Sequence, residues 1–131
     1  MLRYFVLIAL NFLIALSSHS QTRHSQTHDP DFVSFHIDSL EAELDDKTWM
    51  PFFKGQNLLS GIYRLTPGSE DRQEPHNTDE VYYVVKGKAK FIVENKTYEV
   101  NPGKILFVKA GVEHRFFEVE EELLVLVYFD R

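Results

Sequence analysis

Side chains that could bind a metal ion occur in two segments of this sequence. Glu74, His76 and Glu80 lie close together, and His114 follows in a remote segment. Residues i and i+2 of an extended segment point the same way, so Glu74 and His76 can converge on one point. Oxygen and nitrogen donors of this kind suit Fe²⁺, Mn²⁺, Zn²⁺, Ni²⁺ or Co²⁺. The sequence therefore predicts a divalent metal site of His76, Glu80 and His114, with Glu74 as a candidate fourth ligand.

The role of Glu74 has alternatives. Its carboxylate could be an outward-facing surface charge, or a general base beside the ion. Gln73 should face away from Glu74, and a shifted register would exchange the two. If both Glu74 and Glu80 bind the ion, their charges neutralise it, which makes it a weaker Lewis acid and a bound Fe²⁺ easier to oxidise. The His–Glu cluster could also be hydrogen-bonded without any metal.

The elements that position these residues begin with a short N-terminal region. Apolar residues alternate with polar ones over 32–37, a pattern that predicts a strand. Asp38 and Glu41 then form a capping-box-like start for a short helix that continues to Leu44. The apolar cluster at 49–53 is expected to pack in the core, to cap one end of the fold or to join a dimer interface.

The rest of the chain is typical of short strands separated by turns. With the 32–37 segment, about eight strands at even spacing predict an antiparallel sandwich or barrel. Tyr82 shares the side of its strand that carries Glu80, so it could line a pocket or simply pack in the core. The other predicted strands cover residues 58–65, 81–85, 89–93, 97–100, 105–108, 114–119 and 123–129.

Two blocks of this strand region resemble the motifs of the cupin superfamily. The first motif is Gly-x5-His-x-His-x3,4-Glu-x6-Gly, and the second is Gly-x5-Pro-x-Gly-x2-His-x3-Asn. The chain departs from them at Glu74, Lys109 and Glu118, and Glu74 stands where a ligand histidine is expected. The matching residues are Gly68, His76, Glu80 and Gly87 in the first block and Gly103, Gly111 and His114 in the second.

The resemblance implies an all-β fold: a single cupin β-barrel (double-stranded β-helix, or jelly roll) with a short N-terminal helix, covering residues 32–131. It also implies a small metal-dependent enzyme of the dioxygenase, isomerase or lyase type, acting on an organic molecule in the barrel. The alternatives are a non-catalytic cupin that binds a small molecule or a sugar, and a structural cupin without metal. We further expect a homodimer.

The N-terminus predicts export. Arg3 precedes an apolar run at 4–16, which is short for a membrane span and typical of a signal peptide. We therefore expect a signal peptide at 1–20 and a flexible linker at 21–31, with no stable membrane anchor after cleavage. The protein would then be periplasmic or extracellular; the alternative is that the segment is retained as an anchor.

Composition sets the remaining bounds. The chain has 131 residues, which suits one domain, and 44% of them are hydrophobic. A formal net charge of −6 without a basic stripe argues against nucleic acid as a partner. The sequence has no cysteine, so disulfides and thiolate metal ligands are excluded.

Overall fold

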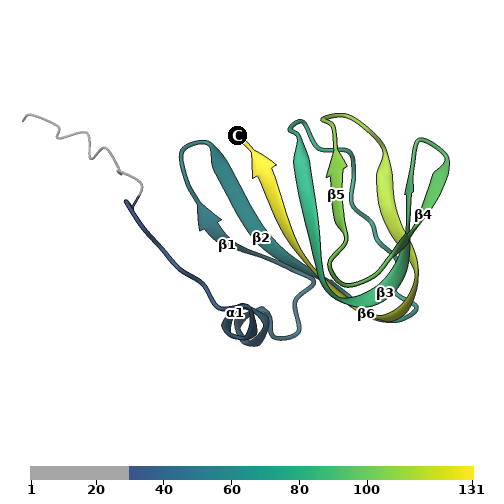
Figure 1. Cartoon of the computed structure of the whole chain (residues 1–131), viewed down its shortest axis with the longest axis horizontal. Helices are drawn as coiled ribbons and strands as arrows, with labels where there is room; N and C mark the ends of the chain where they lie inside the picture. Colours follow the sequence, from purple (N-terminus) through teal and green to yellow (C-terminus); the bar gives the residue numbers. More distant parts are fainter. Residues whose placement is uncertain (1–29) are drawn as a thin grey trace, which may run out of the picture.

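A computed structural model of the chain describes residues 30–131 (Figure 1). The predicted signal peptide and nearly all of the predicted linker therefore lie outside the described residues. Within the described part, no helix is long and apolar enough to cross a membrane. The elements are α1 (Ile37–Leu44), β1 (Trp49–Lys54), β2 (Leu58–Leu65), β3 (Glu80–Val93), β4 (Lys96–Val100), β5 (Ile105–Val108) and β6 (His114–Asp130).

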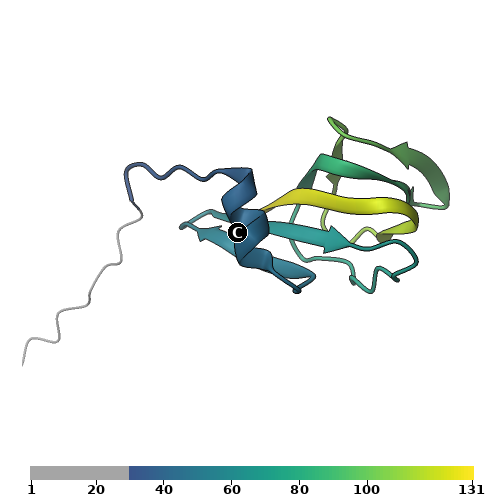
Figure 2. The same ribbon diagram turned by 90° about the horizontal axis from the view of Figure 1, so that it is seen from below.

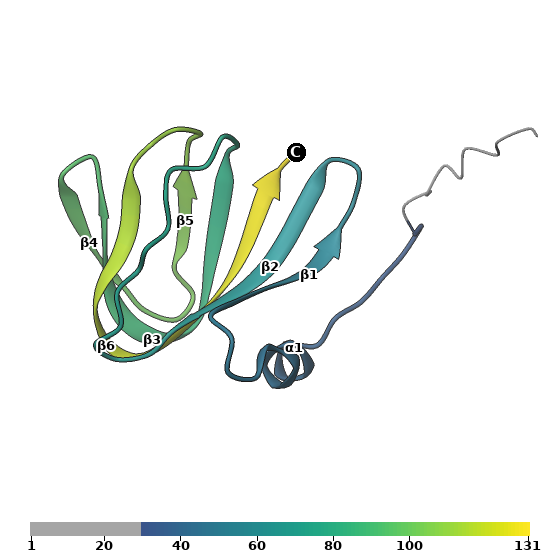
Figure 3. The ribbon, with the colours of Figure 1, turned by 180° about the vertical axis from the view of Figure 1, so that it is seen from behind.

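All six strands belong to one antiparallel sheet. Its order is β1-β2-β6-β3-β4, and β5 pairs with the first half of β3. The long strands β3 and β6 pair along their length, and their register shifts three times between Val84 and Lys90. Such irregularities bend a strand and increase its twist. The sheet consequently folds over on itself, so that the two halves of β3 and β6 face each other (Figures 1 and 3).

Gly87 lies at this bend and has a φ of +95°. A Cβ atom there would come within 2.2 Å of the carbonyl oxygen of Glu122 on β6. The close approach of the two strands and the positive φ both require glycine at this position.

The bend corrects the predicted number of strands. The segments 81–85 and 89–93 are parts of one strand, β3, and 114–119 and 123–129 are parts of β6. The residues between the first two segments, which include Lys86 and Gly87, were expected to be one of the turns that separate the predicted strands. The irregular pairing with β6 absorbs the change of direction instead, so that hydrogen bonding continues beyond the bend.

The N-terminal region also differs from expectation. Residues 32–36 form neither helix nor strand, and Ile37 begins α1 instead of ending a strand. The side chain of His36, not Asp38, caps the helix by accepting from the backbone N–H of Asp38 at 3.3 Å. The helix ends after Leu44, as predicted. The apolar cluster at 49–53 forms most of the edge strand β1, which the sequence analysis did not predict.

Two apolar clusters lie on opposite faces of the sheet. The inner cluster, between the two facing halves, contains Tyr82, Phe91 and Phe116. The outer cluster joins Leu40 and Leu44 of α1 to the sheet, and Figure 2 shows the helix against the β1–β2 end. The predominance of antiparallel strand with one short helix confirms the predicted all-β class.

Candidate metal centre

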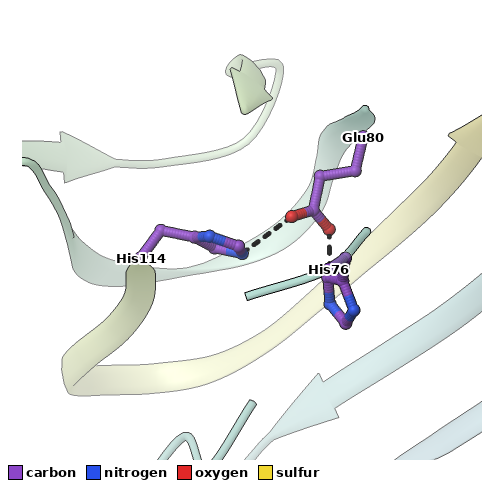
Figure 4. A group of neighbouring side chains, drawn as sticks. All are labelled: His76, Glu80 and His114. Carbon is purple, nitrogen blue, oxygen red and sulfur yellow. Dashed lines mark ion pairs between the residues drawn. The ribbon is translucent and has the colours of Figure 1, made fainter. Parts of the chain in front are cut away.

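The fold brings together three of the four predicted ligands (Figure 4). Glu80 is the first residue of β3, and His114, the first residue of β6, pairs with Val93 at the other end of β3. Because the sheet folds over, these two ends of β3 come face to face. His76 lies on the segment 66–79 that precedes β3. The bend in the sheet is therefore what assembles the site.

The three side chains are close enough to share one ion. His114 Nε2 lies 2.9 Å from Glu80 Oε1, and His76 Nε2 lies 3.6 Å from Glu80 Oε2. One potential ligand atom from each residue lies within 4.8 Å of the others. The Glu80 and His114 side chains are 1% and 0% exposed, whereas His76 is 34% exposed. His76 is thus the candidate ligand nearest to solvent.

The position of His76 is fixed by neighbouring residues. Its carbonyl accepts a hydrogen bond from the N–H of Gly111 at 2.7 Å. Its ring makes an edge-to-face contact with Phe129, with the centroids 4.9 Å apart. Close by, the carboxylate of Asp79 accepts from the N–H of Ala110 at 2.9 Å. These contacts tie the loop to the rest of the barrel while leaving the imidazole partly exposed.

His114 is held in the tautomer that a metal ligand needs. Its Nδ1 lies 2.7 Å from the carbonyl oxygen of Val112, which can only accept, so Nδ1 carries the hydrogen. In the neutral ring Nε2 then has a free lone pair directed toward Glu80, the arrangement usual for metal-binding histidines. Without an ion, a proton can take this place. Burial lowers the pKa of His114, but the Glu80 hydrogen bond, the Val112 carbonyl and nearby negative charge outweigh it and raise the pKa overall.

Glu80 supplies an independent test of whether an ion fits. Its Oε2 atom is the one buried side-chain nitrogen or oxygen in residues 30–131 that has no hydrogen-bond partner. Leaving such an atom without a partner costs free energy, so these atoms are rare and call for an explanation. A divalent cation among Glu80, His76 and His114 would satisfy it, and this donor set suits first-row metals and zinc. The residues fit a metal ion.

Glu74 is not part of this group. Its side chain is exposed, and it lies outside the three-residue cluster. The adjacent Gln73 turns inward instead: its Oε1 accepts from the hydroxyl of Tyr82 at 2.8 Å. Gln73 thus takes the inward orientation expected of Glu74, which is the shifted register that the sequence left open. That Glu74 binds the ion stays a prediction, which its exposure does not favour.

A hydrogen-bonded network that the sequence did not predict lies behind the site. The Tyr82 hydroxyl lies 3.0 Å from His114 Nε2, and Gln73 Nε2 donates to Asp71 at 2.8 Å. Asp71 also accepts from the hydroxyl of Tyr63 at 2.7 Å. Burial and the negative charges nearby raise the pKa of Tyr82, which therefore keeps its proton. The inward-facing position of Tyr82 beside Glu80 was the only signal of this network in the sequence.

A cavity of about 720 Å³ adjoins the three residues on the His76 side. Its wall combines aromatic rings with polar and charged groups, a composition typical of small-molecule sites. A second hollow of about 650 Å³ lies on the His114 side and includes Glu74. Residues lining the first are Thr48, Trp49, Leu59, Tyr63, Glu70, Arg72, Gln73, His76, Asn77, Thr78, Tyr82, Val127, Phe129, Asp130 and Arg131.

Comparison with known proteins agrees with this geometry. A family model described as the cupin domain matches residues 61–129. An uncharacterized protein of Streptomyces coelicolor is 42% identical over 98 residues, which cover 73% of this chain and 93% of the relative. The region that the family model matches contains all three residues of the site.

Solved structures share the fold. TT1209 from Thermus thermophilus has a TM-score of 0.63 at 23% identity and covers 76% of this chain and 97% of its own. KdgF from Halomonas sp. has a TM-score of 0.58 at 19% identity, with 63% and 76% covered. The DMSP lyase DddQ from Ruegeria pomeroyi has the same score and identity, with 63% and 46% covered. These likenesses confirm the predicted barrel type.

Proposed function

Because this chain belongs to the cupin domain family, we propose that it binds a divalent metal ion through His76, Glu80 and His114 and acts on a small organic molecule in the adjoining cavity. The observation that carries this proposal is the buried Oε2 of Glu80, which has no hydrogen-bond partner although the carboxylate lies between two imidazoles. A cation is the partner that resolves it.

Each residue has a distinct part in this function. Glu80 and His114 are almost completely buried and would hold the ion from the barrel interior. His76 borders the cavity and is partly exposed, so it lies where ion and ligand enter. Three protein ligands leave coordination positions open, and a bound ion would supply Lewis acidity that polarises an oxygen of the ligand.

The type of reaction is proposed at a coarser level. Dioxygenase, isomerase and lyase chemistry all use an ion with open positions next to an enclosed ligand. One structural neighbour is a DMSP lyase, which supports a lyase among these candidates without assigning its substrate to this chain. We also retain export as a proposal that rests on the predicted signal peptide.

A second candidate is a cupin that works without metal. In favour of it, a proton on His114 Nε2 can donate to Glu80 at 2.9 Å, so this pair is self-consistent when no ion is present. The same geometry leaves Glu80 Oε2 without a partner. The two candidates therefore differ in whether a cation reaches that oxygen.

Metal analysis of untagged protein decides between them. After reconstitution with Fe²⁺, Mn²⁺ or Zn²⁺, we expect about one ion per chain in the wild type. His76→Ala and His114→Ala should lose it, whereas the control His36→Ala, which removes an exposed imidazole outside the site, should keep it. Glu74→Gln should also keep it, because that side chain is exposed. A wild type that takes up no ion contradicts the proposal and favours the metal-free candidate.

A further inference from the structure

Tyr82 presents its hydroxyl to the proposed metal site and its cavity. The residue is 1% exposed, and it lines the 720 Å³ cavity together with Gln73 and His76. Its oxygen lies 3.0 Å from Nε2 of His114, the atom proposed to bind the ion, and 2.8 Å from Oε1 of Gln73. What this hydroxyl can offer a ligand depends on where its one proton points.

The direction of that proton is set by Asp71. Its carboxylate accepts from Gln73 Nε2 at 2.8 Å, from the N–H of Phe116 at 2.8 Å and from the Tyr63 hydroxyl at 2.7 Å. A carboxylate facing several donors can only accept, so the amide NH₂ of Gln73 must face Asp71. The amide oxygen of Gln73 then faces Tyr82, and it accepts the only proton of that hydroxyl.

Two further acceptors lie near the Tyr82 hydroxyl, His114 Nε2 and the Glu80 carboxylate, and both belong to the proposed ligands of the ion. The Val112 carbonyl keeps the hydrogen of His114 on Nδ1, so Nε2 has one lone pair, and the ion takes it. Tyr82 can therefore no longer donate to His114. Its proton remains with Gln73, and toward the cavity the hydroxyl offers lone pairs alone.

The charged side chains of the cavity wall are consistent with an uncharged ligand. Arg72 is paired with Glu70 at 3.3 Å, and the side chain of Arg131 donates to the carbonyl of Gly55 at 2.9 Å. The wall thus carries two cations, Arg72 and Arg131, and two anions, Glu70 and Asp130, whose formal side-chain charges cancel. The wall also includes Asn77 and Thr78, whose side chains can accept or donate.

We propose that Tyr82 is a specificity-determining residue that selects a neutral, hydroxyl-bearing ligand, such as a sugar or another polyol, at the position beside the ion. A ligand O–H can donate to the Tyr82 oxygen, whereas a carboxylate would oppose its lone pairs to those of Tyr82. Gln73 and Asp71 are positioning residues that act through Tyr82. The inference rests on the proposed function, because the ion is what prevents Tyr82 from donating to His114.

The test uses the full chain loaded with Co²⁺, whose visible absorption reports both uptake of the ion and binding of a ligand to it. Propane-1,2-diol and propionate are titrated as a size-matched pair of neutral donor and anionic acceptor. The quantity measured is the ratio of their dissociation constants. Each variant is compared with the wild type, so that the general attraction of an anion to the cation cancels.

Two variants at the network give different results. Tyr82→Phe removes the accepting oxygen and should weaken diol binding about fivefold, while propionate should bind at least as tightly because the opposing lone pairs are gone. Gln73→Met releases the Tyr82 proton toward the cavity, so propionate should bind about fivefold more tightly while the diol loses its advantage.

The control Lys88→Met, on the exposed surface at the bend, should keep the wild-type ratio. Circular dichroism melts establish that each variant is folded, and Asp71→Asn, which also frees the Gln73 amide, replaces Gln73→Met if that variant does not fold.

The outcomes separate the two proposals. No Co²⁺ uptake by the wild type overturns the proposed function and this inference together. Uptake with a ratio that neither Tyr82→Phe nor Gln73→Met changes overturns this inference alone. A ratio that moves toward propionate in both variants is the result expected, because a merely structural role of the network would weaken both ligands alike.

Discussion

Side chains of opposite charge on β3 and β6 meet in two regions of the molecule, and they differ in burial and in hydrogen bonding. At the bend, lysines of β3 face glutamates of β6 on the solvent side: Lys88 lies 2.7 Å from Glu120, and each side chain is about half exposed. At the strand ends, Glu80 and His114 are buried, and one oxygen of Glu80 has no hydrogen-bond partner. The same pair of strands thus contains two kinds of charged group. One is a ladder of partly exposed ion pairs (Lys86–Glu122, Lys88–Glu120 and Lys90–Glu118), and the other is a buried cluster with an unsatisfied carboxylate oxygen.

The difference separates structural from functional charge. Exposed ion pairs gain little, because water screens them and two long side chains must be ordered. A buried carboxylate without a full set of partners is costly, and it persists where function requires it. Orphaned buried charge, rather than the number of ion pairs, therefore indicates where this molecule acts.

Replacing Glu80 should have the largest effect. Glu80→Gln removes the charge between the two imidazoles, and we expect metal affinity to fall on the order of 1,000-fold, about 4 kcal/mol. The metal-free protein should instead gain roughly 1 kcal/mol in free energy of unfolding at a pH above the raised folded pKa of His114, because the amide can donate to neutral His114. Isothermal titration and urea unfolding measure the two quantities. A metal-free variant that is less stable than the wild type would mean that the unpaired oxygen is not a cost.

The next effect tests the link between the regions. Gly87→Ala introduces a Cβ at 2.2 Å from Glu122 oxygen and a side chain at φ +95°, so we expect a loss of roughly 3 kcal/mol in free energy of unfolding. Metal affinity should fall as well, because the bend brings the ends of β3 together. Gly68→Ala is the control: its φ is also positive, at 77°, but a Cβ there contacts nothing. Equal losses in both variants would show that backbone strain alone, not the close approach of β6, matters at Gly87.

Titration should distinguish the regions as the pH rises above about 6.5. The folded pKa of His114 is raised above its ordinary value near 6.5, so its contribution to stability is complete below about pH 6.5 and is lost as pH rises through the folded pKa. The metal-free protein should thus become less stable with rising pH. At the bend, the pKa of Lys88 is raised from an already alkaline value by Glu120, so the ladder should not titrate there.

Urea unfolding at several pH values measures this slope. His114→Gln should flatten it, and saturating metal should reverse it, because the ion competes with the proton for Nε2. A slope that survives in His114→Gln would assign the titration to another group.

The sequence predicted which residues come together better than it predicted the strands that hold them. The grouping of His76, Glu80 and His114 was indicated by the two segments that resemble cupin motifs, and the structure brings the three side chains together. The bend at Gly87 was not predicted, since Lys-Gly is equally typical of a turn, and only the pairing with β6 shows that the strand continues. The sequence predicted Glu74 to face inward and Gln73 outward, but the structure has the reverse, because side chains in a loop do not alternate with a fixed period. Asp71, which orients Gln73, contacts residues distant in sequence and carried no local signal.

The smallest effect completes the comparison. Lys88→Met removes one member of the exposed ladder, and the unfolding midpoint should shift by less than about 2 °C, because water already solvates both charges. Metal affinity should not change. Thermal unfolding in low and high salt measures the shift, which salt should reduce further. A loss of stability as large as that of Gly87→Ala would mean that the ion pairs between β3 and β6, and not the backbone, maintain the bend. Exposed charge would then be essential to the fold of this molecule, in contrast to the buried charge of Glu80 and His114.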